Sequence, residues 1–336
     1  MTRREILILP ALFFLAACGS CFCTCCHPER RPRSGRSRRT CGCFCSCFCS
    51  SSRVLAAILL LAGPFALSAQ QPRSYLGFDR NDYPGDAALP ALRRTFRYTS
   101  YWLNPPPGES TNTWSGKREI LEHNGFGFLI LFNGRLDAQL KDAQQKGQTP
   151  ATLGAADGTA AVLAAMREGF PPHVLIFLDQ EEGGRLLPEQ DAYLFAWIDA
   201  VRAAGFRPGV YCSGITPPGS ISTAEDIASL VPDRDSIRKN GSPSSPSEAP
   251  IVLWIANDQC PPSPGCKLTA PPVSAASTPD SAPFIRVWQY AQSPRRAQFS
   301  AACPANPSAD NNCYAPNTRI FLDLDTATTP NPSAAP

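Results

Sequence analysis

The chain has 336 residues, of which 31 are Lys or Arg, 28 are Asp or Glu, and 43% are hydrophobic. It is long enough to build one large or two modest domains. Residues 1–73 hold ten Arg and two Glu, whereas residues 74–336 hold 21 basic and 26 acidic side chains. This mildly acidic body lacks the basic surface that nucleic-acid binding requires, so we expect no nucleic-acid partner.

The first 70 residues are typical of a leader. Residues 1–52 are Arg-rich and of low complexity, and ten of the 15 Cys lie between Cys18 and Cys49. Residues 53–70 combine a basic start, a short apolar run and small residues at the end, which is the pattern of a secretory signal peptide. The apolar run is too short for a stable membrane span. We therefore expect residues 53–70 to be the working leader, with a true translation start downstream of Met1.

A second export signal competes with this one. Residues 5–18 are apolar and end in Leu15-Ala-Ala-Cys18, which resembles a bacterial lipoprotein cleavage box. The Cys run of the leader could also hold a soft metal, but export would remove that segment. Either export signal predicts a secreted, periplasmic or cell-envelope protein of a bacterium, with no metal in its mature form.

Five Cys lie in the exported body, and none of them forms a CxxC pair. A zinc ribbon or a thioredoxin-like site is therefore unsupported. Cys260/Cys266 and Cys303/Cys313 each flank a short loop, which predicts two local disulfides in an oxidising compartment. Cys212 ends an apolar run and is predicted to be a buried free thiol.

From residue 74 onward, short apolar runs alternate with helical segments. Most runs are nearly continuous in apolar, β-branched or aromatic residues, as in strands covered on both faces. The pattern predicts an α/β fold, a single-domain (β/α)8 TIM barrel over residues 74–327. The eight predicted strands are Tyr75–Asp79, Arg97–Leu103, Gly127–Asn133, Val174–Asp179, Arg207–Cys212, Ile251–Ala256, Phe284–Tyr290 and Arg319–Asp323.

A doubly wound open sheet is the alternative architecture. No Gly-rich phosphate turn follows any run, so we expect no nucleotide cofactor. Residues 232–250 and 260–283 are rich in Pro, Ser, Gly and Ala and predict partly disordered surface insertions, while residues 328–336 predict a disordered tail. The predicted helices are Leu89–Phe96, Trp114–Asn124, Thr159–Gly169 and Glu189–Gly205.

Carboxylates follow three of the predicted strands. Asp79 ends the first strand, Asp179 the fourth and Asp323 the eighth, which are the positions that open onto the active-site face of a barrel. Asp179 and Glu181 are two residues apart, so their side chains point the same way if the strand continues. Two carboxyls in one partly apolar pocket cannot both ionise easily, and the raised pKa of one suits a general acid. The alternative is that each Asp is a helix N-cap or a turn residue.

Histidine offers no competing chemistry in the body. Only His123 and His173 are present, and neither follows a predicted strand. A Ser/His/Asp triad or a His-rich metal site is therefore not expected.

Aromatic side chains lie at the ends of the second and seventh predicted strands. Trp and Tyr faces stack on sugar rings through apolar CH surfaces, so a site that carries both suits carbohydrate. The alternative for each is packing in the core. The predicted substrate-binding residues are Tyr101, Trp102, Trp288, Gln289 and Tyr290.

Five short motifs together resemble glycoside hydrolase family 25 lysozymes. The resemblance is closer to their relatives, the bacterial glycoside hydrolase-like TIM-barrel domain, a domain family of unknown function, and it covers roughly residues 74–327. The motifs are Gly77-Phe-Asp79, Phe177-Leu-Asp179-Gln-Glu181, Val252-Leu-Trp254-Ile-Ala256, Trp288-Gln-Tyr290 and Asp323-Leu-Asp325.

The resemblance implies a barrel that binds or cleaves glycans, with cell-wall peptidoglycan as the usual lysozyme substrate. Glu181 matches the catalytic acid that protonates the glycosidic oxygen, and Asp179, Asp79 and Asp323 match its supporting carboxylates. Asp179 or Asp79 would stabilise the positive charge, activate water or activate the acetamido group of the substrate. We therefore expect a secreted glycoside hydrolase-like protein without a cofactor; the alternative is a non-catalytic barrel that binds a glycan or the cell envelope.

Overall fold

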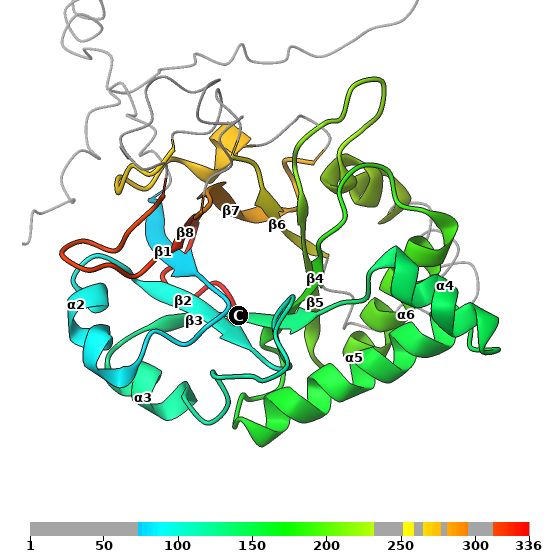
Figure 1. The fold of residues 1–336 in the computed structure, drawn as a ribbon, viewed down its shortest axis with the longest axis horizontal. Coiled ribbons are helices and arrows are strands. Elements are labelled where there is room, and N and C mark those ends of the chain that lie inside the picture. The colour runs from blue at the N-terminus through cyan, green and yellow to red at the C-terminus, as the bar shows by residue number, and fades with distance from the viewer. Residues whose placement is uncertain (1–72, 232–250, 259–264, 277–280, 295–311, 336) are drawn as a thin grey trace, which may run out of the picture. The chain divides into compact units, whose positions relative to one another are not determined.

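Eight β-strands, taken in the order of the sequence, close into a barrel (Figure 1). The computed structural model describes residues 73–231, 251–258, 265–276, 281–294 and 312–335. The expected leader segments 1–52 and 53–70, Cys18 and the insertion at 232–250 lie outside these residues. The strands are β1 (Tyr75–Asp79), β2 (Tyr98–Trp102), β3 (Gly127–Asn133), β4 (Leu175–Gln180), β5 (Arg207–Ser213), β6 (Val252–Ala256), β7 (Ile285–Ala291) and β8 (Asp323–Ala327). The predicted α/β barrel is confirmed.

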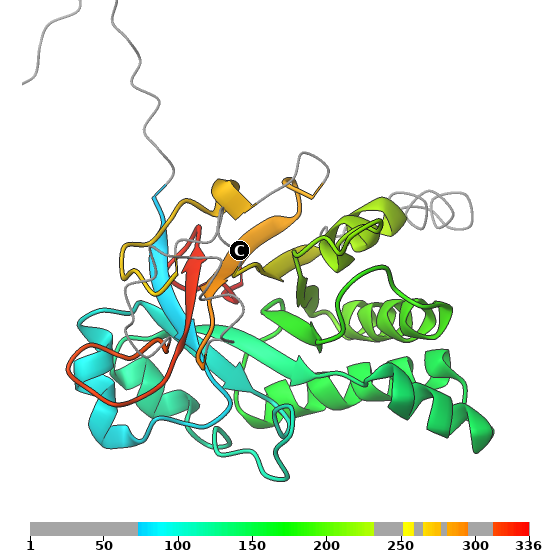
Figure 2. The same ribbon diagram turned by 45° about the horizontal axis from the view of Figure 1, so that its top comes forward.

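The α-helices cover one side of the barrel, next to β2 to β5 (Figures 1 and 2). After β6, the described residues contain only one short 3-10 helix, η2. No helix in the described part of the chain is both long and apolar enough to cross a membrane. The helices are η1 (Asp86–Ala88), α2 (Leu89–Arg93), α3 (Arg118–His123), α4 (Asp137–Gln145), α5 (Pro150–Arg167), α6 (Pro188–Ala203) and η2 (Val273–Ala276). Residues 223–231, between β5 and β6, are also helical.

The last strand runs in the opposite direction to the other seven. β1 to β7 pair in parallel, whereas β8 is antiparallel to both β7 and β1. A parallel eighth strand would need a connection that crosses from the end of β7 back to the opposite end of the barrel. Instead, the described residues before β8 turn back near the end of β7, where Tyr314 and Phe321 form an antiparallel bridge. The predicted eighth strand, Arg319–Asp323, is therefore wrong in position and direction: β8 begins at Asp323. We call the barrel end where β1 to β7 finish and β8 begins the acidic end, and the opposite end the base.

Large side chains fill the barrel interior because glycines on neighbouring strands leave room for them. A Cβ atom on Gly77 of β1 would lie 2.0 Å from the ring of Tyr98, and one on Gly209 of β5 would lie 2.6 Å from the ring of Phe177. Both rings are fully buried. The interior is therefore a packed core, which leaves only the ends of the barrel accessible to a ligand.

One disulfide links the connection after β6 to the chain just before β8. It joins Cys266 to Cys313, with 5.3 Å between their Cα atoms. The predicted local pairs of these residues with Cys260 and Cys303 are therefore wrong; Cys260 and Cys303 themselves lie outside the described residues. Barrel closure brings together segments that are 47 residues apart in sequence. Cys212 is buried and free, as predicted.

Non-reducing digestion of the protein should yield a peptide pair that joins Cys266 to Cys313. The variant Cys266→Ser/Cys313→Ser should lose about 2–4 kcal/mol of unfolding free energy, because the unfolded chain is no longer closed into a long loop. Urea denaturation measures this loss, and Cys212→Ala, which leaves the disulfide intact, is the control for removal of a cysteine. Recovery of Cys266 in a peptide pair with Cys260 would contradict the structure.

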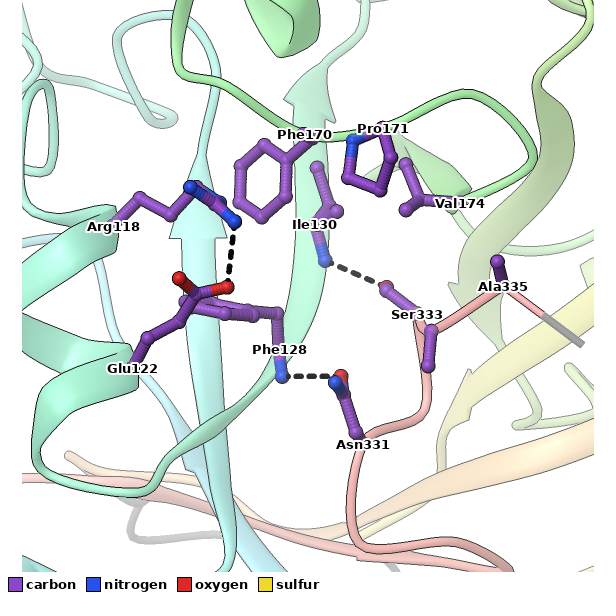
Figure 3. A pocket seen from close by; sticks show the side chains of 11 residues that line it. Arg118, Glu122, Phe128, Ile130, Phe170, Pro171, Val174, Asn331, Ser333 and Ala335 are labelled. Atoms are coloured by element: carbon purple, nitrogen blue, oxygen red, sulfur yellow. Dashed lines mark hydrogen bonds and ion pairs between the residues drawn. The ribbon is translucent and has the colours of Figure 1, made fainter.

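The segment after β8 crosses the base of the barrel. Phe128 donates its backbone N–H to Asn331 Oδ1 at 2.9 Å, and Ile130 donates its N–H to Ser333 Oγ at 3.0 Å, as Figure 3 shows. Leu175 N–H donates to the Ser333 carbonyl at 2.9 Å. Residues 328–335 therefore satisfy backbone groups of β3 and β4, and the disordered tail predicted for residues 328–336 is wrong for these eight.

Replacing Ser333 by Ala should leave the buried N–H group of Ile130 without an acceptor. We expect the unfolding free energy to fall by about 1–3 kcal/mol, the usual cost of a buried unsatisfied donor. Urea denaturation followed by circular dichroism measures it. The control is Thr329→Ala, an exposed hydroxyl in the same segment, which should change stability by less than about 0.5 kcal/mol. Equal effects of both variants would argue against this role for Ser333.

Candidate active site

Strand register brings four Asp side chains together at the acidic end. Asp79 ends β1 and lies directly opposite Asp323 on β8, so the two side chains share one face of the sheet. Asp325 lies two residues further along β8 and points the same way. On the other side of the barrel, Asp179 on β4 is two residues from Phe177, so the two side chains share one face, and the ring of Phe177 packs against Trp254 of β6. All four therefore face the barrel interior.

Asp179 and Glu181 form one carboxyl pair. Asp179 is only 3% exposed, and neither of its oxygens accepts a hydrogen bond from a protein donor. The carboxyl of Glu181, just after β4, lies close enough for the two groups to share a proton. Glu181 itself is exposed to solvent. The pair thus joins a buried carboxyl to one that a ligand can reach.

Asp79 and Asp325 form a second pair, which is buried. Gln289 on β7 donates its Nε2–H to Asp79 Oδ2 at 2.8 Å, and Trp254 on β6 donates its Nε1–H to Asp325 Oδ1 at 2.9 Å. Asp325 Oδ2 has no such donor and faces Asp79 instead. Each carboxyl of the pair is therefore held from outside by one neutral donor, which leaves the space between them for a shared proton.

A short relay of amide and hydroxyl groups fixes Gln289. Its Oε1 accepts hydrogen bonds from Tyr211 Oη–H and from Gln292 Nε2–H, each at 2.8 Å. With both donors on the oxygen side, the Nε2 side of Gln289 must face Asp79. Two donors on the oxygen also strengthen the bond that Nε2 gives to Asp79.

Burial, more than any neighbouring charge, raises the pKa values of these carboxyls. It raises the pKa of Asp79 to about 6, although the bond from Gln289 opposes the shift. Burial first and the nearby Glu181 second raise the pKa of Asp179 well above its usual range. Glu181 as a whole residue is exposed, but protein atoms surround its carboxyl group; the resulting desolvation raises the pKa of Glu181, and the hydrogen bond with Asp179 lowers it. The site therefore keeps protons at pH values where exposed carboxylates have lost them.

Asp323 and Asp325 complete the acidic end. Asp323 accepts a hydrogen bond from the backbone N–H of Ser293, and burial followed by the charge of Asp79 raises its pKa. Burial, followed by the charge of Asp79, also raises the pKa of Asp325. Asp325 belongs to the motif Asp323-Leu-Asp325, but the sequence predicts only Asp323 of this motif as a site residue. The signal that could have identified it is its spacing of two residues from Asp323, which puts both on one face of a strand.

The predicted aromatic residues do not line the acidic end. Tyr101, Trp288 and Tyr290 alternate with the interior positions of their strands, so they point outward, and all three are fully buried. Trp288 donates to the Asn257 carbonyl at 3.0 Å, and Tyr101 donates to Glu168 Oε2 at 2.5 Å. These three residues pack between the barrel and its surroundings, so the structure does not support their predicted contact with a substrate.

Two of the five predicted substrate-binding residues do face the interior. Trp102, at the end of β2, is 4% exposed and donates its Nε1–H to the Arg80 carbonyl at 3.0 Å. Gln289 is 1% exposed and bonds Asp79. Both positions suit holding the site in shape more than contacting a sugar. Among the described residues, no three His, Cys, Asp or Glu side chains are arranged to hold a metal ion.

Replacing Asp79 by Asn should stabilise the protein at pH 7 but not at pH 4. The folded pKa of Asp79 is about 6, against an ordinary value of 3.8. The folded protein therefore binds this proton more tightly than the unfolded chain, and that stability is complete below about pH 4 and lost as the pH rises through about 6. Asn avoids the loss, so its advantage in unfolding free energy should grow by about 1–3 kcal/mol between pH 4 and 7.

Urea denaturation at both pH values measures this growth. Glu119→Gln, at an exposed position of α3, is the control and should show no comparable change. An advantage of Asp79→Asn that does not depend on pH would show that Asp79 is not buried as described.

Comparison with known proteins finds one domain family whose model matches part of the chain. Residues 101–260 match the model of the Rv2525c-like, glycoside hydrolase-like domain. This match confirms the resemblance to the bacterial glycoside hydrolase-like domain that the sequence motifs indicated. No curated protein matches the chain.

Solved structures with a similar barrel include an uncharacterised protein of B. stearothermophilus, at 21% identity and a TM-score of 0.49, covering 75% of this chain and 95% of that one. The catalytic domain of the endolysin ply40 from Listeria monocytogenes bacteriophage P40 has 14% identity and a TM-score of 0.39, with coverages of 76% and 93%. A family 25 glycosyl hydrolase from Bacillus anthracis has 12% identity and a TM-score of 0.36, with coverages of 75% and 88%.

Proposed function

From the match to a glycoside hydrolase-like domain, together with the paired carboxyls of the acidic end, we propose that this protein is an exported glycosidase. The observation that carries the proposal is the pair formed by buried Asp179 and exposed Glu181. A group that must deliver a proton at near-neutral pH needs a raised pKa and access to the substrate, and Glu181 has both.

In the proposed reaction, Glu181 gives its proton to the glycosidic oxygen as the bond from that oxygen to the anomeric carbon breaks. Asp179, whose oxygens have no other donor, shares its proton with Glu181 and can restore it when Glu181 becomes ionised. The ionised form of Asp79, held by Gln289, faces the same interior and stabilises the positive charge that develops on the sugar. Water then adds its oxygen to the anomeric carbon, and the proton that this water loses returns to the carboxyl pair of Asp179 and Glu181, which restores the starting state.

Peptidoglycan is the first substrate to test, because the sequence motifs resemble those of family 25 lysozymes. The disulfide between Cys266 and Cys313 supports the export that the leader predicts, because such bonds persist in oxidising compartments. We propose that residues 53–70 direct this export and that residues 74–335 form the exported barrel.

Purified protein should release reducing ends from peptidoglycan or from another bacterial polysaccharide. Glu181→Gln keeps the size of the side chain but cannot supply the proton, so kcat should fall by about 10²- to 10⁴-fold. Asp179→Asn should also lower kcat, because the amide cannot return a proton to Glu181. A reducing-sugar assay over a panel of polysaccharides measures both effects.

The control is Glu119→Gln, which replaces an exposed carboxyl on α3 and should retain full activity. Circular dichroism checks that every variant is folded. If neither the wild type nor any variant releases reducing ends while all of them still bind one glycan, the protein is a non-catalytic glycan-binding barrel and the proposal is wrong.

A further inference from the structure

A pocket lies at the base of the barrel, the end opposite to the carboxyl pairs, and we call it the base pocket. Its volume is about 470 Å³. One wall is made by the first residues of β4, β5 and β6, among them Leu175 and Val252, and the other by the segment after β8 that crosses the base. Figure 3 shows a neighbouring pocket on the other side of the same segment, where Asn331 and Ser333 fix it to β3.

The charge of this base pocket is positive and is not neutralised. Two Arg side chains line it, Arg207 from the start of β5 and Arg286 from the start of β7, and no acidic residue does. No Asp or Glu in the described part of the chain forms an ion pair with either of them. Arg207 donates to the Ala334 carbonyl at 3.2 Å. Arg286 donates to the carbonyls of Pro283 and Ile285, each at 3.0 Å. Burial, and after it the positive charge of Arg286, lowers the pKa of Arg207, so the two guanidinium groups repel each other electrostatically.

We propose that the base pocket binds a phosphate group carried by a sugar-sized molecule. Guanidinium groups suit oxyanions because their N–H donors match phosphate oxygens in pairs, and two cations match a doubly charged phosphate better than a singly charged carboxylate. Thr328 and Thr329, two residues with hydroxyl groups, belong to the same lining.

The rest of the pocket suits the body of such a ligand. Leu175, Val252, Pro330 and Pro332 provide apolar walls, and the volume exceeds what a bare phosphate ion needs. The site does not depend on the glycosidase proposal, because it lies at the other end of the barrel and shares no residue with the carboxyl pairs.

Isothermal titration of the full chain with glucose 6-phosphate, at constant ionic strength, tests the site. Inorganic phosphate and glucuronate are the comparison probes, one lacking the sugar and the other replacing phosphate by carboxylate. We expect glucose 6-phosphate to bind most tightly, and Arg286→Gln to weaken its binding at least tenfold. Arg94→Gln, at an exposed position outside the lining, is the matched control and should bind like the wild type.

Arg207→Gln should weaken binding as strongly, but this variant also loses its bond to Ala334, so its folding is checked by circular dichroism. Arg286 is exposed, and its variant keeps the test decisive even if Arg207→Gln does not fold. The proposal is overturned if glucose 6-phosphate gives no heat beyond that of dilution, if glucuronate binds as tightly, or if Arg286→Gln binds it like the wild type.

Discussion

The acidic end gathers buried carboxyl groups that have no ion-pair partner among the described residues. Asp79, Asp179 and Asp325 are buried, and no Lys or Arg among the described residues lies within ion-pair distance of any of them. Full ionisation of such a group would cost far more than neutral hydrogen bonds recover. Shared protons remove much of that cost. The proposed chemistry, the raised pKa values and the placing of Gln289 and Trp254 all follow from this one constraint.

The half of the barrel formed by β6 to β8 is not stabilised by packed α-helices in the described residues, unlike the other half, so other contacts must stabilise it. α5 and α6 pack against the early strands, whereas the described residues after β6 contain no α-helix. The disulfide between Cys266 and Cys313 braces one end of this half, and the segment after β8 closes the other. Rigid support on this side matters because β7 and β8 carry Gln289, Asp323 and Asp325.

Sequence patterns predicted the parts of this structure that depend on local chemistry. Apolar runs located β1 to β7 closely, and the acids at strand ends proved to converge. The direction of β8 could not be predicted, because the run Arg319–Asp323 and the true strand Asp323–Ala327 overlap only at Asp323, and periodicity carries no information on direction. The same holds for Trp288 and Tyr290: two residues two apart share a face, but only the closed barrel shows that the face is the outer one. The disulfide partner of Cys266 was likewise set by distances in space.

The reversed last strand also decides where the chain leaves the barrel. Seven parallel strands followed by an eighth would deliver the following residues to the acidic end, where they would crowd a substrate. Because β8 runs the other way, the chain passes Ala327 at the base and continues there to Ala335. An affinity tag, a fluorescent protein or a surface anchor joined after that point would therefore emerge away from Glu181, and the barrel could be immobilised through its C-terminus with the carboxyl pairs still facing outward.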